Sequence, residues 1–164
     1  MSDPRDGADV IAPLLGGDAT AERVGPKAAT LAKLHEAGLP IPEGFCLTAD
    51  AYRAQIVSAG VEDAAGRVGR ADSHEARRLA LQVRLGLFRA PLASLVTDPL
   101  GAAFERLTTE PGTLVAVRSS ALLEDSPTAS FAGQFDTFLG VANPADLVTA
   151  VRACWASLWS TRAL

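Results

Sequence analysis

The chain has 164 residues, of which 48% are hydrophobic, so it has the size of one domain and enough apolar side chains to bury a core. Its net charge is −4 and its basic residues are spread along the sequence, which argues against nucleic acid as a partner. No apolar run approaches the ~20 residues of a membrane span, and the N-terminal stretch, with its early acids, is unlike a signal peptide. Neither a membrane nor secretion is therefore expected.

Three predicted helices start in the same way, with a residue suited to cap a helix followed by a proline at the first helical position. They begin at Pro26, Pro99 and Pro144. The first should end at Gly38, because glycine followed closely by a further proline stops a helix. Each of these starts is visible without reference to any other part of the chain.

Two further helices are predicted over residues 50–60 and 73–89, and Asp72 and Glu75 are spaced as a capping box for the second. Residues 61–72, with two glycines, have the composition of a surface loop. Helices interleaved with a few short strands predict an α/β or α+β layered fold. We expect residues 1–164 to form a single domain.

Strands are predicted over residues 44–48, 113–117 and 135–141. The second is a continuous apolar run, as expected for a sheet covered on both faces. Cys46 and Cys154 lack the spacing of a metal or redox site and are predicted to be buried, reduced thiols, which fits a cytoplasmic protein.

Arg118 stands at the end of the second strand and is followed by a stretch of small and polar residues, 119–133. Arginine is always charged, and its planar fork suits phosphate oxygens. The serine hydroxyls would add donors, and Gly133 would let the backbone approach a ligand closely. The pattern favours an anion site; the alternative is a surface loop in which Arg118 pairs with Glu124 or Asp125.

Lys27 lies in the first turn of the helix predicted from Pro26. The helix dipole disfavours a cation there but favours a bound anion, so a role at an anion would explain the lysine. The alternative is a solvated lysine. No Walker A motif occurs.

The remaining candidates for chemistry are few. His35 and His74 are the only histidines, and we expect both to be structural or exposed, so a Ser-His-Asp hydrolase is not expected. Trp155 and Trp159, one helical turn apart, are expected in the core or at a subunit contact rather than as a stacking platform for bases.

Two long stretches carry a family resemblance. GPKAATLAKLHEAGLPIPEGFCLTADAYR, residues 25–53, resembles the pattern GGKGxxLxxLxxxGxPVPxGFxxTxxAY, which opens the ATP-binding domain of phosphoenolpyruvate synthase, pyruvate phosphate dikinase and rifampicin phosphotransferase. VRSSALLEDSPTASFAGQFDTFLGV, residues 117–141, is similar to VRSSAxxEDxxxASFAGQxDTxLxV of the same family. Within this stretch, the residues SFAGQ and DT are more similar to the synthase and rifampicin branches of the family than to the dikinase branch.

The resemblance implies the N-terminal lobe of an ATP-grasp-type fold, a small mixed sheet packed with several helices, and a second lobe that closes with it on ATP. It implies that Lys27 and Arg118 contact phosphates and that Gly133 and Thr137 lie against the nucleotide. Residues 119–133 would then be a mobile loop covering the β- and γ-phosphates. Pro26 and Ala28 replace two glycines of the family pattern, and because proline lacks an N–H we expect weakened phosphate contact there.

The complete enzyme implied by the resemblance would transfer a phosphoryl group from ATP to a histidine on another domain and then to pyruvate, water or an antibiotic. The Mg²⁺ ligands would come from the second lobe, which with the phosphohistidine domain would lie in the same chain or in a separate one. Because the sequence ends within a helical pattern, we expect an excised lobe, a fragment or a subunit of a split enzyme, inactive alone and prone to self-association. The alternatives are a non-catalytic interaction module, docking through Trp155 and Trp159, and an anion-binding domain unrelated to ATP.

Overall fold

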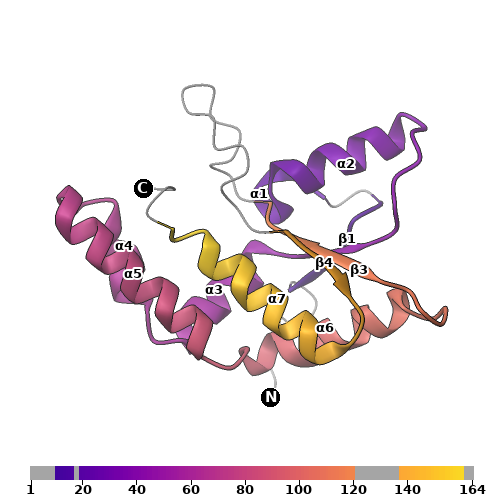
Figure 1. The fold of residues 1–164 in the computed structure, drawn as a ribbon. Coiled ribbons are helices and arrows are strands. Elements are labelled where there is room, and N and C mark those ends of the chain that lie inside the picture. Colours follow the sequence, from indigo (N-terminus) through magenta and orange to yellow (C-terminus); the bar gives the residue numbers. More distant parts are fainter. Residues whose placement is uncertain (1–9, 17–18, 121–136, 161–164) are drawn as a thin grey trace, which may run out of the picture.

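A computed structural model of the chain describes residues 10–16, 19–120 and 137–160, and it confirms the mixed α+β class (Figure 1). The elements in chain order are β1 (Ile11–Pro13), α1 (Ala21–Val24), α2 (Pro26–Glu36), β2 (Phe45–Leu47), α3 (Ala49–Ser58), α4 (Glu62–Val68), α5 (Ser73–Arg89), α6 (Ser94–Leu107), β3 (Val115–Arg118), β4 (Thr137–Val141) and α7 (Pro144–Ser157).

The strands of the described ranges form two separate two-stranded antiparallel sheets rather than one mixed sheet. β1 pairs with β2, and β3 pairs with β4. The sequence reading missed β1, which is three residues long and too short to show a period. The prediction that the strand around Val117 is covered on both faces is wrong, because its residues alternate between half-buried and exposed, and Ala116 and Arg118 are exposed.

The structure confirms three of the helix starts that the sequence predicted. Asn143 caps α7 by accepting a hydrogen bond from the Asp146 amide at 2.9 Å, and Pro144 takes the first helical position. Asp72 caps α5 by accepting from the amides of His74 and Glu75. Pro26 opens α2 after Gly25, as predicted. Local chemistry therefore determines where these helices begin.

Two predictions about local structure are wrong. Residues 61–72 contain the helix α4 rather than only a loop, and the helix forms because Ala64 and Val68 bury one side of it against α5. α6 begins at Ser94, so Pro99 lies inside the helix instead of starting it. A proline in a helix interior costs about 3 kcal/mol. Burial of Val96 and Leu100, at about 1.5–3 kcal/mol each, offsets that cost.

The core consists of two main clusters with α7 between them. One cluster gathers buried residues of α6 and α7, among them Val96, Leu100 and Val151. The other gathers residues of α3, α4 and α5, among them Leu79 and Val83. Figure 1 shows α7 running through the middle of the molecule, between the α4–α5 pair and the β3–β4 sheet. α7 thus connects the sheet to the helical part of the fold.

The two tryptophans of α7 and its C-terminal end make contacts within the chain. Trp155 packs against both core clusters, and its ring lies 5.9 Å from that of Tyr52 between centroids. The Trp159 indole N–H donates to the Tyr52 hydroxyl at 2.6 Å. Burial raises the pKa of Tyr52 to about 12, although the hydrogen bond with Trp159 acts in the opposite direction. The two tryptophan side chains therefore contribute to the core, which was one of the two locations predicted for them.

Within the described ranges no single helix is long and apolar enough to cross a membrane. The bent pair formed by α5 and α6, with 59° between the two helices, meets the length and composition criteria together. Both helices bury part of their apolar residues in the core, which accounts for their composition.

Candidate functional site

Arg118 and Thr137, two of the residues predicted to contact the nucleotide, lie opposite each other in the β3–β4 sheet. They are paired in the ladder, and both are exposed. Directly opposed residues of an antiparallel pair share a face, with Cβ atoms about 4.5–5.5 Å apart. The guanidinium and the hydroxyl therefore stand on the same open face of the sheet.

An irregularity in β4 produces this pairing. Val115 pairs with Val141, but Val117 pairs with Phe138, so β4 carries one extra residue between the two pairs. Gly140 lies in that interval with a φ of +72°, as a glycine in a β-bulge does. Because one extra residue exchanges the two faces of a strand, the bulge directs Phe138 into the core and Thr137 to the face of Arg118.

The residues that follow Arg118 contact the N-terminus of α2. The Ala28 amide donates to the Ser120 hydroxyl at 3.1 Å, across 92 positions of the sequence. Ala28 is the third residue of α2, so the Ser120 hydroxyl takes the place of a capping side chain that Gly25 cannot supply. The contact connects the first family-like motif to the second.

Gly25 is required for this contact. A Cβ at Gly25 would lie 1.6 Å from the Ser120 carbonyl oxygen and 2.5 Å from its hydroxyl, so the Ser120 segment lies directly against the glycine. The backbone of Gly25, with φ +82° and ψ 163°, is also in a region that only glycine adopts readily. Two independent reasons therefore exclude a side chain at this position.

Lys27 and Arg118 consequently project from segments that touch. Lys27 precedes Ala28, and Arg118 stands two residues before Ser120. Lys27 is half-buried and makes interactions within the fold, whereas Arg118 is exposed. Two cations separated widely in sequence thus belong to one neighbourhood, where their positive charges favour an anion.

Three of the first four residues of α2 offer no free amide to such an anion. Pro26 has no N–H, the Ala28 amide is engaged by Ser120, and the Ala29 amide bonds to the Gly25 carbonyl at 3.1 Å. The first turn of a helix normally offers several free amides to a phosphate. An anion at this helix end would therefore depend more on side chains, such as those of Lys27 and Arg118, than on the backbone.

Gly133 and residues 121–133 of the predicted phosphate-covering loop lie outside the described residues, as do Glu124 and Asp125. Their predicted roles stay predictions. Ser119 and Ser120, at the start of that stretch, are half-buried.

The other candidates of the sequence reading take no part in this neighbourhood. His35 and His74 are exposed. Cys154 is buried and Cys46 is half-buried, and neither forms a disulfide. Burial raises the pKa of the Cys46 thiol to about 11, so the thiol is protonated at neutral pH. In the part of the chain that the structure describes, no group of three or more His, Cys, Asp or Glu residues could hold a metal ion.

Sequence reasoning missed the positional roles of Gly25 and Ser120. The sequence predicts Gly25 as a helix-capping residue and Ser120 as one hydroxyl among several. The signal for Gly25 was available, because a Gly-Pro pair supplies no capping side chain and so requires a cap from elsewhere. Nothing local in the sequence distinguishes Ser120 from its neighbour Ser119.

A hollow of about 650 Å³ lies elsewhere, between the β1–β2 sheet and α6. It is lined mostly by apolar side chains, and Glu43 and Arg106 are the charged residues of its lining. None of the residues predicted to bind the nucleotide lines it, so it is separate from the Lys27–Arg118 neighbourhood.

A lysine and an arginine brought together at a helix N-terminus and a sheet edge are features of domains that bind phosphate groups. The chain belongs to the family "pyruvate phosphate dikinase, AMP/ATP-binding domain", whose model matches residues 21–164. The match includes both segments that meet at Ser120.

Several curated proteins are similar to the chain. It is 37% identical over 151 residues to phosphoenolpyruvate synthase of Aeropyrum pernix, covering 86% of this chain and 18% of the synthase. It is 41% identical over 148 residues to rifampicin phosphotransferase of Streptomyces sviceus, covering 86% and 17%. It is 41% identical over 153 residues to prodigiosin synthesizing transferase PigC of Serratia marcescens, covering 91% and 16%. The chain thus spans less than a fifth of the length of these relatives.

Proposed function

We propose that this chain is the first lobe of the ATP-binding domain of a phosphotransferase similar to phosphoenolpyruvate synthase and rifampicin phosphotransferase. The complete enzyme, with an ATP-grasp fold, transfers a phosphoryl group from ATP to a histidine on another domain and then to an acceptor. The second lobe and the phosphohistidine domain belong to the same polypeptide or to a separate chain. In this lobe Lys27 and Arg118 bind the phosphates, and Thr137 and Gly133 lie against the nucleotide.

The contact between Ser120 and the N-terminus of α2 is the observation that carries the proposal. It brings the Lys27 segment and the Arg118 segment together, which is what a single polyphosphate bridging them requires. Attraction between two fixed cations and a polyanion is strong where the cations are positioned before the ligand arrives. The bulge that places Thr137 beside Arg118 adds a hydroxyl donor to the same face.

The described residues include no group of three or more His, Cys, Asp or Glu side chains that could hold a metal ion. Phosphoryl transfer requires a metal that bridges the phosphates. We propose that the second lobe supplies the metal ligands, so that this lobe by itself binds nucleotide weakly and catalyses nothing.

Calorimetric titration with MgATP tests the assignment, on the chain alone and with a second lobe from a relative added in trans. We expect Lys27→Ala and Arg118→Ala each to raise Kd by roughly tenfold or more, since a hydrogen bond to a charged group is worth about 1.5–3 kcal/mol. Lys33→Ala, in the exposed part of α2, and Arg70→Ala are matched controls that remove the same charge elsewhere. Site variants that bind MgATP as tightly as the controls would refute the assignment.

A non-catalytic interaction module is the second candidate. One face of α5 favours the interaction module, because it exposes large apolar side chains with arginines beside them. The two candidates differ in one measurement: the enzyme hypothesis requires turnover of ATP once the second lobe and the phosphohistidine domain are supplied, and the module hypothesis predicts none.

A further inference from the structure

α5 has two opposite faces, of which one is buried in the core and the other is largely exposed. Its buried face packs Leu79, Val83 and Leu87 into the core against α4 and α7. Its opposite face carries Leu81, Leu85 and Phe88, whose exposed fractions are 52%, 40% and 52%. Large apolar side chains gathered on one exposed helix face mark an interaction site more often than scattered ones do.

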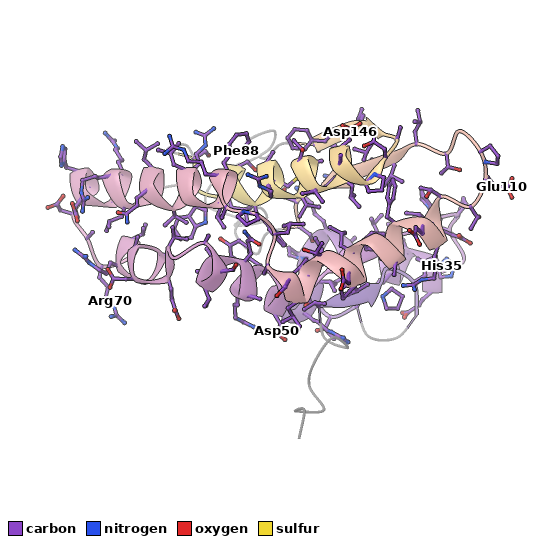
Figure 2. The ribbon with its side chains drawn as sticks, turned by 90° about the horizontal axis from the view of Figure 1, so that it is seen from below. His35, Asp50, Arg70, Phe88, Glu110 and Asp146 are labelled. Atoms are coloured by element: carbon purple, nitrogen blue, oxygen red, sulfur yellow. The ribbon has the colours of Figure 1, made fainter. Side chains whose placement is uncertain are left out.

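The exposed apolar residues have the spacing of a coiled-coil seam. Leu81, Leu85 and Phe88 are separated by four and then three positions, so they occupy successive d, a and d positions of a heptad. In the same register the buried residues fall at b, c and f, on the far side of the helix. Figure 2 shows Phe88 on the side of α5 that faces away from α4.

Arginines flank this seam. Arg77 and Arg84 occupy g positions and Arg89 an e position, and all three are exposed. Arg152 of α7 adds a fourth guanidinium, which lies 5.9 Å from the centre of the Phe88 ring and donates to the Phe88 carbonyl. The one acid of α5, Glu75, is already paired with Arg78 at 2.7 Å. In this register the g side carries Arg77 and Arg84, whereas the e side carries Arg89 together with the uncharged Gln82 and with Glu75, whose partner Arg78 falls at the a position before Leu81. The surroundings of the seam are therefore positive on balance, although the whole chain has a net charge of −4.

We propose that this face of α5 binds a helix of another protein or domain that carries apolar a and d positions flanked by Glu or Asp. The seam, defined by Leu81, Leu85 and Phe88, supplies the apolar contact. The flanking arginines select the partner, because residues at e and g form the ion pairs that set coiled-coil partner choice. The inference is independent of the nucleotide site, since none of these residues belongs to it.

Two other occupants fit the face less well. A second copy of the same face would bring arginines against arginines in either orientation, and such like-charge pairs are unfavourable. An anionic lipid surface suits a helix with a wide apolar face, whereas this seam is a narrow a/d stripe, the form typical of helix pairing. Charge and width together favour an acidic helix.

The test uses the full chain and a fluorescent synthetic helix of about three heptads, with Leu at a and d and Glu at e and g. A second peptide has Lys in place of Glu. We expect the acidic peptide to bind, as measured by anisotropy, the Lys peptide not to bind, and the affinity to fall as salt is added. The Arg77→Glu/Arg84→Glu variant should raise the Kd of the acidic peptide about tenfold or more and bind the Lys peptide instead.

Matched variants keep the result interpretable. Arg70→Glu introduces a charge change of the same kind away from the seam and should leave peptide binding unchanged. Leu85→Gln should abolish binding while the circular dichroism melt stays within a few degrees of wild type, because Leu85 is on the exposed face. Titration with MgATP should be the same for all of these variants, which separates a failure here from a failure of the nucleotide site.

Three outcomes would overturn the inference. The first is binding of the acidic peptide that Arg77→Glu/Arg84→Glu and Leu85→Gln leave unchanged. The second is binding to phosphatidylserine–phosphatidylcholine vesicles with none to the acidic peptide, which would assign the face to a lipid surface. The third is self-association in sedimentation experiments that Leu85→Gln abolishes, with no peptide binding, which would assign the face to a second copy of the chain.

Discussion

Gly25 is the residue on which the proposed nucleotide site depends most directly. It is buried, and its Cα faces the Ser120 carbonyl so closely that a methyl group has no room. The family pattern also has glycine at this position, and the structure supplies the physical reason in this chain. The residue has no polar side chain to contribute, yet it decides whether two motifs can meet.

Gly25→Ala is expected to separate the Ser120 segment from α2. The backbone conformation alone costs roughly 1–3 kcal/mol for a residue other than glycine, and the clash at 1.6 Å adds to that cost. Urea unfolding should show the loss of stability, and MgATP affinity should fall with it. Gly66→Ala is the opposite control: Gly66 lies within α4 with open space around it, so alanine there should stabilise the fold by about 0.5–1 kcal/mol.

Ser120→Ala and Ser120→Thr distinguish the hydroxyl from the close packing. Alanine removes the acceptor for the Ala28 amide and should lower the free energy of unfolding by about 1 kcal/mol, as loss of a cap does. Threonine keeps the hydroxyl and should recover most of that loss. If both variants were equally destabilised, the packing of Ser120 and not its hydrogen bond would hold the two segments together.

Cys46 carries the clearest pH dependence. Burial raises its pKa from the ordinary cysteine value of 9.0 to about 11 in the fold, so the folded state holds the thiol proton more tightly. The resulting stability is fully present below pH 9 and is lost as the pH rises through about 11. At pH 8, in a Cys154→Ala background, a thiol reagent should modify folded Cys46 far more slowly than the urea-unfolded chain, in which roughly 100-fold more thiolate is present. Equal rates would show that Cys46 is not protected.

At the scale of the elements, β4 shows how one glycine determines which side chains reach the site. Without the bulge, the pairing of Val115 with Val141 would continue to Arg118 opposite Phe138, and Thr137 would turn to the other face. Gly140 accommodates the extra residue because its positive φ costs glycine nothing. The sequence hint was weak, since the strand alternates only roughly.

Gly140→Ala is expected to cost about 1–2 kcal/mol, because the left-handed conformation strains alanine while nothing lies within 4 Å of the added methyl. Chemical denaturation measures the loss. The variant should also weaken MgATP binding, because strain at the bulge disturbs the pairing of Thr137 with Arg118. Gly112→Ala, at another glycine of positive φ with open space around it, serves as the control, with a similar loss of stability and unchanged nucleotide affinity.

At the scale of the whole molecule, α7 connects the part of the chain that holds the site to the part that holds the α5 face. It contacts β3, β4 and α5, and Trp155 belongs to both core clusters. The proposed nucleotide site and the α5 face therefore lie in different parts of the molecule, with α7 between them (Figure 1). Of the exposed seam of α5, Phe88 also contacts α7, through the guanidinium of Arg152.

The convergence of Lys27 and Arg118 can be tested at this scale with a double-mutant cycle. If both cations contact one polyphosphate, their effects on MgATP affinity should be non-additive by about 0.5 kcal/mol or more, whereas effects at distant, independent sites add. Lys33→Ala combined with Arg118→Ala supplies the additive reference. An additive Lys27–Arg118 pair would show that the two side chains serve different ligands.

The sequence by itself determined the features that depend on neighbouring residues. The starts of α2, α5 and α7 follow from capping residues and prolines within one turn, and the α+β class follows from the succession of periods. The family-like motifs also identified Lys27, Arg118 and Thr137 as candidates without any coordinates. Each helix start depends on interactions with residues only a few positions away in the sequence.

Only the tertiary structure decided what depends on distant residues. α4 and the first turn of α6 form because buried partners outweigh a loop-like composition and an internal proline. The roles of Gly25 and Ser120 exist only where segments 92 positions apart touch, and the seam on α5 is recognisable only once Leu79, Val83 and Leu87 are known to be buried. A periodic pattern states that a helix has an apolar face, but packing alone shows which of two apolar faces remains exposed to a partner.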